Sequence, residues 1–189
     1  DGCGAHEIII DTPKFPSKFE DLSVEEVSSI LFTAKERAND LQRDFRIRYI
    51  SIFKNQGALA GASISHPHTQ IIALPIIPKN ILTEIESCRN HYKKTSRSLV
   101  CDLAISEIRA KVRVVEDDDN FVSFCPYASF WPFEVNICPK KTVKDFTALD
   151  DGSIFELSRI LLSSIKRISM ALKGVSFNIF LKTMPPKRE

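Results

Sequence analysis

Three polar residues at alternate positions, His66, His68 and Gln70, have the clearest chemical potential in the sequence. In a β-strand, alternate side chains share one face, so the three are predicted to point to the same side of an otherwise apolar strand. A neutral imidazole is a nucleophile near pH 7 and can attack an activated phosphorus, which divides one transfer into two covalent steps. Glutamine can donate to a phosphoryl oxygen but cannot carry a proton, which favours transfer to a phosphate acceptor over hydrolysis by water.

The segment before this strand is a loop of small residues with Gly57 and Gly61. Such a loop lets backbone N–H groups approach an anion closely, and these groups would stabilise charge on phosphoryl oxygens during transfer. Asn55 and Ser63 can add neutral donors. The sequence therefore predicts a phosphate-binding loop next to His68.

Other interpretations of the histidines compete with catalysis. Imidazole is a common zinc ligand, so a His-x-His pair alone does not distinguish a metal site from a nucleophile. The glycine-containing loop favours catalysis by His68, with a lapsed active site as the alternative. His6 is predicted to be a strand residue with a local hydrogen bond, and His91 a surface residue. The acidic run 116–119 is interpreted as a solvated turn rather than a metal site.

Composition limits the class of protein. The chain has 189 residues, 43% of them hydrophobic and 26% charged, which is typical of a folded globular protein. A formal charge of +2 argues against a nucleic-acid partner. The most apolar stretch, 71–78, is short and contains two prolines, so no membrane partner is predicted. Five scattered cysteines without a C-x-x-C pair indicate reduced thiols and a cytoplasmic location.

Strands and helices alternate along the sequence. Ser23 and Glu26 have the spacing of a capping box at the start of an amphipathic helix. Helices are expected over 24–41, over 78–98, where the chain would cross the sheet, and over 154–172. Strands are expected over 6–10, 48–54, 68–74, 133–138 and 177–181, with a hairpin at 113–125.

The second half of the chain repeats the first at an offset of 127 residues. Glu7 falls on Glu134 (134 − 7 = 127), and Phe53 falls on Phe180. One strand–helix–strand unit therefore occurs twice. The predicted fold class is α/β (α+β), with two copies, at 1–98 and 99–189, each an antiparallel sheet packed by a long helix. Counterparts of the hairpin and of the two histidines would fall outside the chain, so a longer protein truncated at both ends is expected.

The motif around His68 resembles the galactose-1-phosphate uridylyltransferase branch of the histidine-triad superfamily. The run from Phe53 through Asn55 and Gly61 to His66-Pro67-His68-x-Gln70 is similar to the active-site motif of that family without a gap. The second half is similar at 131–134 and 138–140. The segments 54–57 and 60–63 are as similar to the plant-type ADP-glucose phosphorylase subgroup.

The resemblance implies two histidine-triad-like copies and a ping-pong nucleotidyl transfer. A nucleoside monophosphate, with UMP expected, would pass from a nucleotide sugar to His68, which gives a covalent His68–nucleotide intermediate. It would then pass to a sugar 1-phosphate, or to inorganic phosphate in a phosphorylase. The α-phosphate would be held by Asn55, Gly61, Ser63 and Gln70. The alternatives are a nucleotide-sugar phosphorylase or hydrolase and a non-catalytic structural descendant. The partners implied are a nucleotide sugar, a sugar 1-phosphate and a second copy in a homodimer.

The resemblance also implies that His66 orients the site or binds a structural zinc. The turn Thr12-Pro13-Lys14 is followed by Phe15, where the family often has a histidine, and the family's cysteine pair has no counterpart. No cofactor or bound metal is therefore predicted, and a structural zinc would need residues outside this chain.

Overall fold

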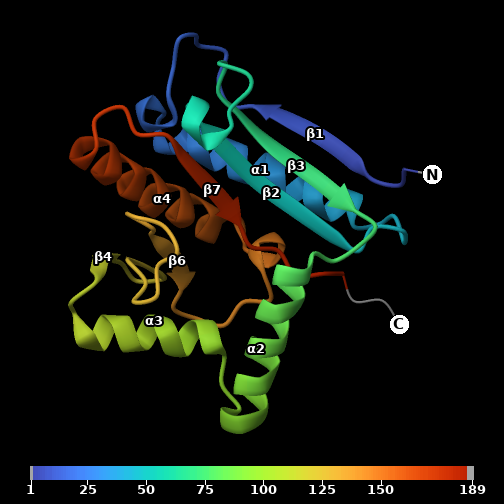
Figure 1. The fold of residues 1–189 in the computed structure, drawn as a ribbon, viewed down its shortest axis with the longest axis vertical. Helices are drawn as coiled ribbons and strands as arrows, with labels where there is room; N and C mark the ends of the chain where they lie inside the picture. Colours follow the sequence, from blue (N-terminus) through green and yellow to red (C-terminus); the bar gives the residue numbers. More distant parts are fainter. Residues whose placement is uncertain (1, 187–189) are drawn as a thin grey trace.

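The computed structural model describes residues 2–186 as two antiparallel sheets with helices packed against them (Figure 1). Sheet A contains four strands in the order β1 (Ala5–Ile10), β3 (His68–Leu74), β2 (Tyr49–Gln56) and β7 (Phe177–Leu181). Sheet B contains β4 (Val114–Asp117), β5 (Phe121–Phe124) and β6 (Asn136–Pro139). The predicted α/β class with antiparallel sheets is confirmed.

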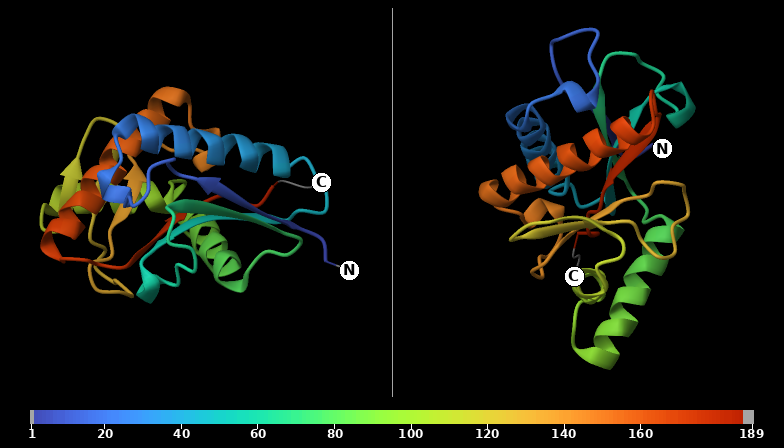
Figure 2. Two further views of the ribbon diagram at one scale, coloured as in Figure 1. Left: turned by 90° about the horizontal axis from the view of Figure 1, so that it is seen from above. Right: turned by 90° about the vertical axis from the view of Figure 1, so that its left-hand side faces the viewer.

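Two long helices, α1 (Val24–Leu41) and α4 (Asp151–Ala171), pack against each other and bury their apolar faces with sheet A in one core. Each helix begins at a side-chain cap. Ser23 and Glu26 form the predicted capping box, and Asp150 Oδ1 accepts from the Ser153 N–H at 2.7 Å. In Figure 2, left, α1 lies on one side of sheet A and the short η2 turn (Ala58–Ala60) on the other.

The 127-residue repeat is visible in the structure. The offset carries the short helix η1 (Phe19–Asp21) onto η3 (Phe146–Ala148), and it carries α1 into α4. The equivalent residues Phe53 and Phe180 are paired across the antiparallel β2–β7 contact, with ring centroids 6.3 Å apart. When equivalent residues of two copies pair across antiparallel strands, a local two-fold axis between the strands relates the two copies. The two copies therefore meet at the β2–β7 contact.

Several elements differ from the sequence prediction. The segment over 78–98 forms the helix α2 (Lys79–Thr95), but α2 extends away from sheet A and does not cross it (Figure 1). The helix α3 (Leu99–Ala110), which was not predicted, places Ala104 against β5. The predicted strand over 133–138 begins only at residue 136, because Phe133 has a φ of 61° and is not extended.

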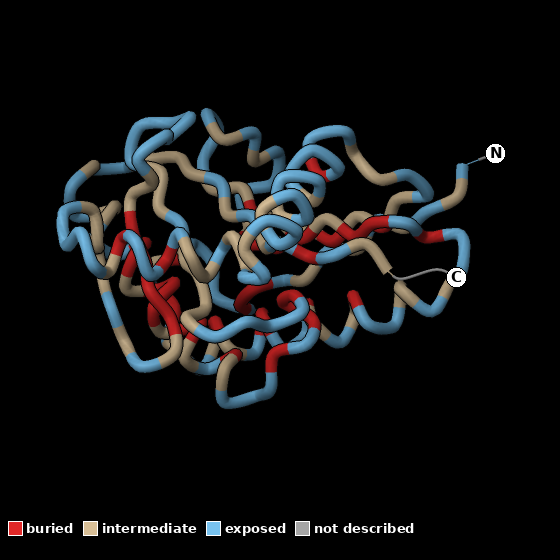
Figure 3. Tube along the Cα trace, turned by 90° about the horizontal axis from the view of Figure 1, so that it is seen from below, coloured by how far each residue is buried: buried red, intermediate tan, exposed pale blue. Residues whose placement is uncertain are grey.

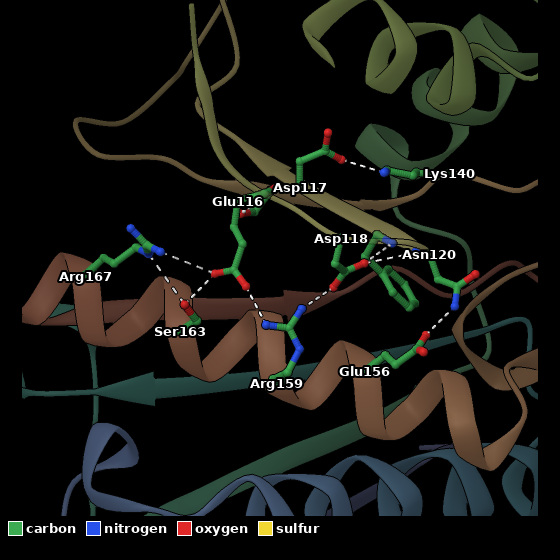
Figure 4. Close-up of polar contacts among 11 residues, drawn as sticks. Glu116, Asp117, Asp118, Asn120, Lys140, Glu156, Arg159, Ser163 and Arg167 are labelled. Carbon is green, nitrogen blue, oxygen red and sulfur yellow. Dashed lines mark hydrogen bonds and ion pairs between the residues drawn. The ribbon is translucent and has the colours of Figure 1, made fainter. Parts of the chain in front are cut away.

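The acidic run 116–119, which begins at the end of β4, is not a solvated turn. Glu116 accepts hydrogen bonds from Arg159 Nη1 and Ser163 Oγ on α4, both at 2.5 Å (Figure 4). Asp118 also pairs with Arg159, and Asp117 pairs with Lys140 Nζ at 2.6 Å. The run therefore fastens sheet B to α4.

Sheet A takes one strand, β7, from the second half of the chain, and the division into copies at residue 98 stays a prediction.

Figure 3 shows buried stretches inside the molecule and exposed loops around them. The five cysteines are free thiols. Among residues 2–186, no helix combines the length and apolar character needed to cross a membrane.

Candidate active site

His68 is the first residue of β3 and lies opposite Ile10 of β1. Its neighbours Thr69 and Ile71 are buried on the helix-covered face, so strand alternation places His68 and Gln70 on the opposite face. His68 itself is only 3% exposed. The strand that carries the predicted nucleophile is therefore fixed by pairing on both edges, to β1 and to β2.

The hydrogen bond of the His68 ring determines which nitrogen is free. Nδ1 lies 2.8 Å from the carbonyl oxygen of His66. A carbonyl oxygen only accepts, so Nδ1 carries the proton and donates. In the neutral ring, Nε2 then keeps its lone pair, as a nucleophile requires.

The His66 ring does not share this arrangement. His66 precedes β3, its Nε2 donates to the Thr12 carbonyl oxygen at 2.7 Å, and Phe15 stacks on the ring with centroids 5.6 Å apart. His66 lies outside β3, so the shared direction of the three polar side chains stays a prediction for this residue, whose ring is engaged by the 12–15 segment. Its contribution to His68 comes from the backbone carbonyl.

The residues around His66 do not fit a zinc site. Its Nε2 donates to the Thr12 carbonyl oxygen and Phe15 stacks on the ring, so only Nδ1 could serve as a ligand nitrogen. Within residues 2–186, no group of three or more His, Cys, Asp or Glu side chains is arranged to hold a metal ion.

Gln70 is oriented by a histidine from the neighbouring strand. His6 Nε2 lies 3.0 Å from Gln70 Oε1, and an amide oxygen only accepts, so His6 is the donor. The hydrogen bond expected for His6 was a local one, whereas the bond found joins β1 to β3. It leaves the Gln70 amide nitrogen available as a donor on the same face as His68.

The loop before β3 depends on two glycines with positive φ. Gly57 has a φ of 87° and Gly61 a φ of 80°, which glycine adopts readily. A Cβ on Gly57 would also lie 2.1 Å from Ser176 Oγ. The Gly61 N–H donates to the Ala58 carbonyl oxygen at 3.0 Å, so this amide is used inside the loop rather than held free for a phosphate. The contribution of Gly61 visible here is the shape of the loop.

Asn55 and Asn178 connect the loop to the second half of the chain. Asn178 Nδ2 donates to Asn55 Oδ1 at 2.8 Å and to the Ala60 carbonyl oxygen at 2.9 Å. This fixes the Asn55 amide with its oxygen toward β7, so its nitrogen is the free donor. Ser63 lies farther along the loop and is exposed. Gln70, Asn55 and Ser63 thus supply neutral donors from β3, β2 and the loop.

Sequence reasoning missed three residues near the site: Asn178, Asp11 and Lys54. Lys54 Nζ pairs with Asp11 Oδ2 at 2.5 Å on the helix-covered face of sheet A, and both side chains are almost fully buried. The sequence did carry a signal for Lys54. It shares the strand face of Ile50 and Ile52, where a charged residue needs a buried partner.

Comparison with known proteins agrees with the motif. Residues 2–78 match the model of the N-terminal domain of galactose-1-phosphate uridyl transferase. ADP-glucose phosphorylase of Arabidopsis thaliana is 32% identical over 186 residues, which is 98% of this chain and 52% of the relative. The chain is homologous to the galactose-1-phosphate uridylyltransferase family. The uridylyltransferase of Streptomyces lividans is 28% identical, over 87% of this chain and 46% of the relative.

Solved structures of similar proteins share the fold. A crystal structure of ADP-glucose phosphorylase from Arabidopsis thaliana with bound ADP-glucose superposes with a TM-score of 0.89 at 31% identity, over 96% of this chain and 57% of that chain. A uridylyltransferase structure has a TM-score of 0.89 at 26% identity, over 97% and 58%. The chain spans about half the length of the curated relatives that it matches.

Proposed function

We propose that this chain carries the nucleophile of a nucleotidyltransferase acting on nucleotide sugars. His68 Nε2 attacks the α-phosphorus, an N–P bond forms, and the bond from phosphorus to the sugar-phosphate oxygen breaks. Sugar 1-phosphate leaves. A phosphate oxygen of the acceptor then attacks the same phosphorus and releases His68. The observation that carries this proposal is the His68 Nδ1–His66 carbonyl hydrogen bond, which in the neutral ring leaves the lone pair on Nε2.

The neutral donors around His68 suit this reaction. Gln70 Nε2 and Asn55 Nδ2 each belong to an amide whose oxygen is held by a neighbour, His6 or Asn178. Preorganised donors of this kind stabilise charge that develops on phosphoryl oxygens, because they need not reorient during the reaction. The hydroxyl of Ser63 adds a third donor, and Gly61 shapes the loop. His66 orients the site through its carbonyl.

The identity of the nucleotide and of the acceptor gives two candidate activities. The uridylyltransferase relatives support UMP transfer between a nucleotide sugar and a hexose 1-phosphate. The similarity to ADP-glucose phosphorylase, over 98% of this chain, favours AMP transfer to inorganic phosphate as the second candidate. The proposal includes a homodimer in the cytoplasm with no nucleic-acid or membrane partner.

An isotope-exchange experiment tests the covalent pathway. The protein is incubated with UDP-glucose or ADP-glucose and labelled glucose 1-phosphate, with no other acceptor. A covalent intermediate predicts that label enters the nucleotide sugar. The absence of exchange with both nucleotide sugars would contradict the proposal and favour a non-catalytic descendant.

The acceptor separates the two candidates. After the first half-reaction, galactose 1-phosphate should yield a UDP-hexose if the protein is a uridylyltransferase, and inorganic phosphate should yield ADP if it is a phosphorylase. Product formed with water alone would indicate a hydrolase instead.

A further inference from the structure

The Asp11–Lys54 ion pair lies beneath the backbone that carries His68. Their side chains are 0% and 3% exposed, and Nζ and Oδ2 are 2.5 Å apart. The pair lies among apolar groups, including the Phe19 ring, whose centroid is 5.5 Å from Nζ. Burying two charges costs desolvation that their attraction often fails to recover, and apolar replacements are frequently as stable. Stability alone therefore does not account for this pair.

Each member of the pair holds a part of the segment 67–69. Lys54 Nζ donates to the His68 carbonyl oxygen at 3.2 Å. The Asp11 N–H donates to the Pro67 carbonyl oxygen at 3.0 Å, and Asp11 Oδ1 accepts from Thr69 Oγ1 at 2.8 Å. These contacts fix three consecutive residues from the face opposite to the imidazole.

The second copy provides an internal comparison. At the 127-residue offset, Asp11 corresponds to Cys138 and Lys54 corresponds to Leu181. Cys138 is largely buried, and this burial raises its pKa to about 11, so the thiol is neutral. The copy without a described counterpart of His68 thus has uncharged residues where the first copy has an ion pair.

We propose that Asp11, Lys54 and Thr69 are positioning residues that hold the backbone of His68, so that Nδ1 stays on the His66 carbonyl and Nε2 stays free. This inference rests on the proposed function for its kinetic consequence, but not for its structural one. None of the bonds of these three residues goes to the imidazole ring, so their proposed effect on the ring is transmitted through the backbone.

The first test removes both charges together with D11N/K54M, which avoids leaving one buried charge without its partner. The matched control is E7Q/R37M, which removes the Glu7–Arg37 pair between β1 and α1, where Arg37 Nη2 lies 2.8 Å from Glu7 Oε1. That pair joins the same sheet to α1, and neither residue forms a hydrogen bond or ion pair with residues 66–69. Both variants are compared with the unmodified protein by ¹⁵N NMR of the histidine rings and by single-turnover formation of the His68 adduct.

The expected spectrum of the unmodified protein shows His68 as the Nδ1–H tautomer. D11N/K54M should show a mixture of tautomers, and E7Q/R37M should match the unmodified protein. Adduct formation in D11N/K54M should be about 100-fold slower, as displacements of about 1 Å in an active site can cause. Binding of the nucleotide sugar should change little, because the donors on the loop are untouched.

His68 resonances in D11N/K54M that coincide with those of the unmodified protein would overturn the inference. If D11N/K54M does not fold, T69V keeps the ion pair and removes only the hydrogen bond to Asp11. A shift of the His68 tautomer in T69V would support the inference, and an unchanged spectrum would overturn it. If the unmodified protein forms no adduct while the tautomer still changes, the proposed function fails and the positioning role stands.

Discussion

The two copies of the repeat use the same framework to different ends. In the first copy, β3 lies between β1 and β2 and is hydrogen-bonded to both. In the second copy, β6 and β7 belong to different sheets, and no strand among residues 2–186 lies between them. The first copy therefore holds its histidine within a continuous set of strands. The second copy contributes helix α4 to the core and strand β7 to the edge of sheet A.

The contact between the copies lies close to the predicted chemistry. Asn178 of β7 orients the Asn55 amide, and Ser176 occupies the space beside Gly57. The comparison shows that the second copy supports the loop of the first copy. Substitutions in the first copy should therefore affect chemistry, and substitutions between the copies should affect both chemistry and stability.

The largest expected effect is the loss of the nucleophile. H68Q should reduce formation of the nucleotide adduct by at least about 10⁴-fold, because the attacking nitrogen is gone. H91Q is the matched control, since His91 Nε2 is hydrogen-bonded to Asp102 Oδ2 at 2.7 Å, away from the loop. A labelled adduct in H68Q at the unmodified rate would break the assignment of chemistry to the first copy.

The next effect tests the contact between the copies. G57A should lower the free energy of unfolding by about 3 kcal/mol, from a strained positive φ and from overpacking against Ser176. The control is G174A, because Gly174 has a φ of 67° but nothing within 4 Å of an added Cβ. G174A should cost only about 1–2 kcal/mol. Equal losses in urea unfolding would show that the Ser176 contact does not matter.

A smaller loss of stability is expected when the ion pairs that join a strand to a helix are removed. Each half of the chain has such ion pairs. R159M removes the donor shared by Glu116 and Asp118 and should cost about 1–2 kcal/mol, since Arg159 is partly exposed. The matched variant R37M removes the donor to Glu7. Circular dichroism during unfolding should show R159M loosening the packing of sheet B on α4. An unchanged unfolding midpoint in R159M would contradict a fastening role.

The interactions of Glu116 with Arg159 and Ser163 should also make the stability of the protein depend on pH. Burial raises the pKa of Glu116, but hydrogen bonds from Ser163 and Arg159 outweigh it and hold the pKa below its ordinary value of 4.5. A depressed carboxyl pKa contributes stability that is present above the unfolded value and is lost as pH falls through the folded value. E116Q should therefore show a shallower loss of stability below about pH 4.5. Parallel acid profiles for E116Q and the unmodified protein would contradict this.

The smallest effect concerns Gln70. H6A removes the donor that orients the Gln70 amide, and one exposed hydrogen bond of this kind is worth a few-fold in affinity or rate, about 0.5–1 kcal/mol. The KM for the nucleotide sugar should rise more than kcat falls. H91A serves as the remote histidine control. No change in KM for H6A would show that Gln70 needs no such orientation.

Local patterns predicted most of the framework. The capping box, the helical periodicity and the 127-residue offset located α1, α4 and β7, because these signals are contained in short stretches of sequence. The direction of α2 and the existence of α3 were not predicted. Helix α3 packs against sheet B, and α2 contacts α3. These are long-range contacts, which no local pattern reveals.

For the candidate site too, the residues within one local motif could be predicted from the sequence, and the residues that come from distant segments could not. His68, Gln70, Asn55 and Ser63 lie within one continuous motif, so their types and spacing were enough to predict a common site, although their roles stay predictions. Asp11 and Lys54 are 43 residues apart in the sequence, and Asn178 is 123 residues from Asn55. Sheet pairing brings these residues together. The partners of the His66 ring also come from a distant segment, at Thr12 and Phe15.

The central claim is that His68 Nε2 carries the nucleotide. The most direct measurement is peptide mapping by mass spectrometry after brief incubation with UDP-glucose or ADP-glucose and an alkaline quench. We expect one nucleoside monophosphate on the peptide that contains His68, with fragment ions that assign it to His68 and not to His66. A nucleotide on another residue, or release of sugar 1-phosphate with no protein-bound nucleotide, would show that His68 is not the nucleophile.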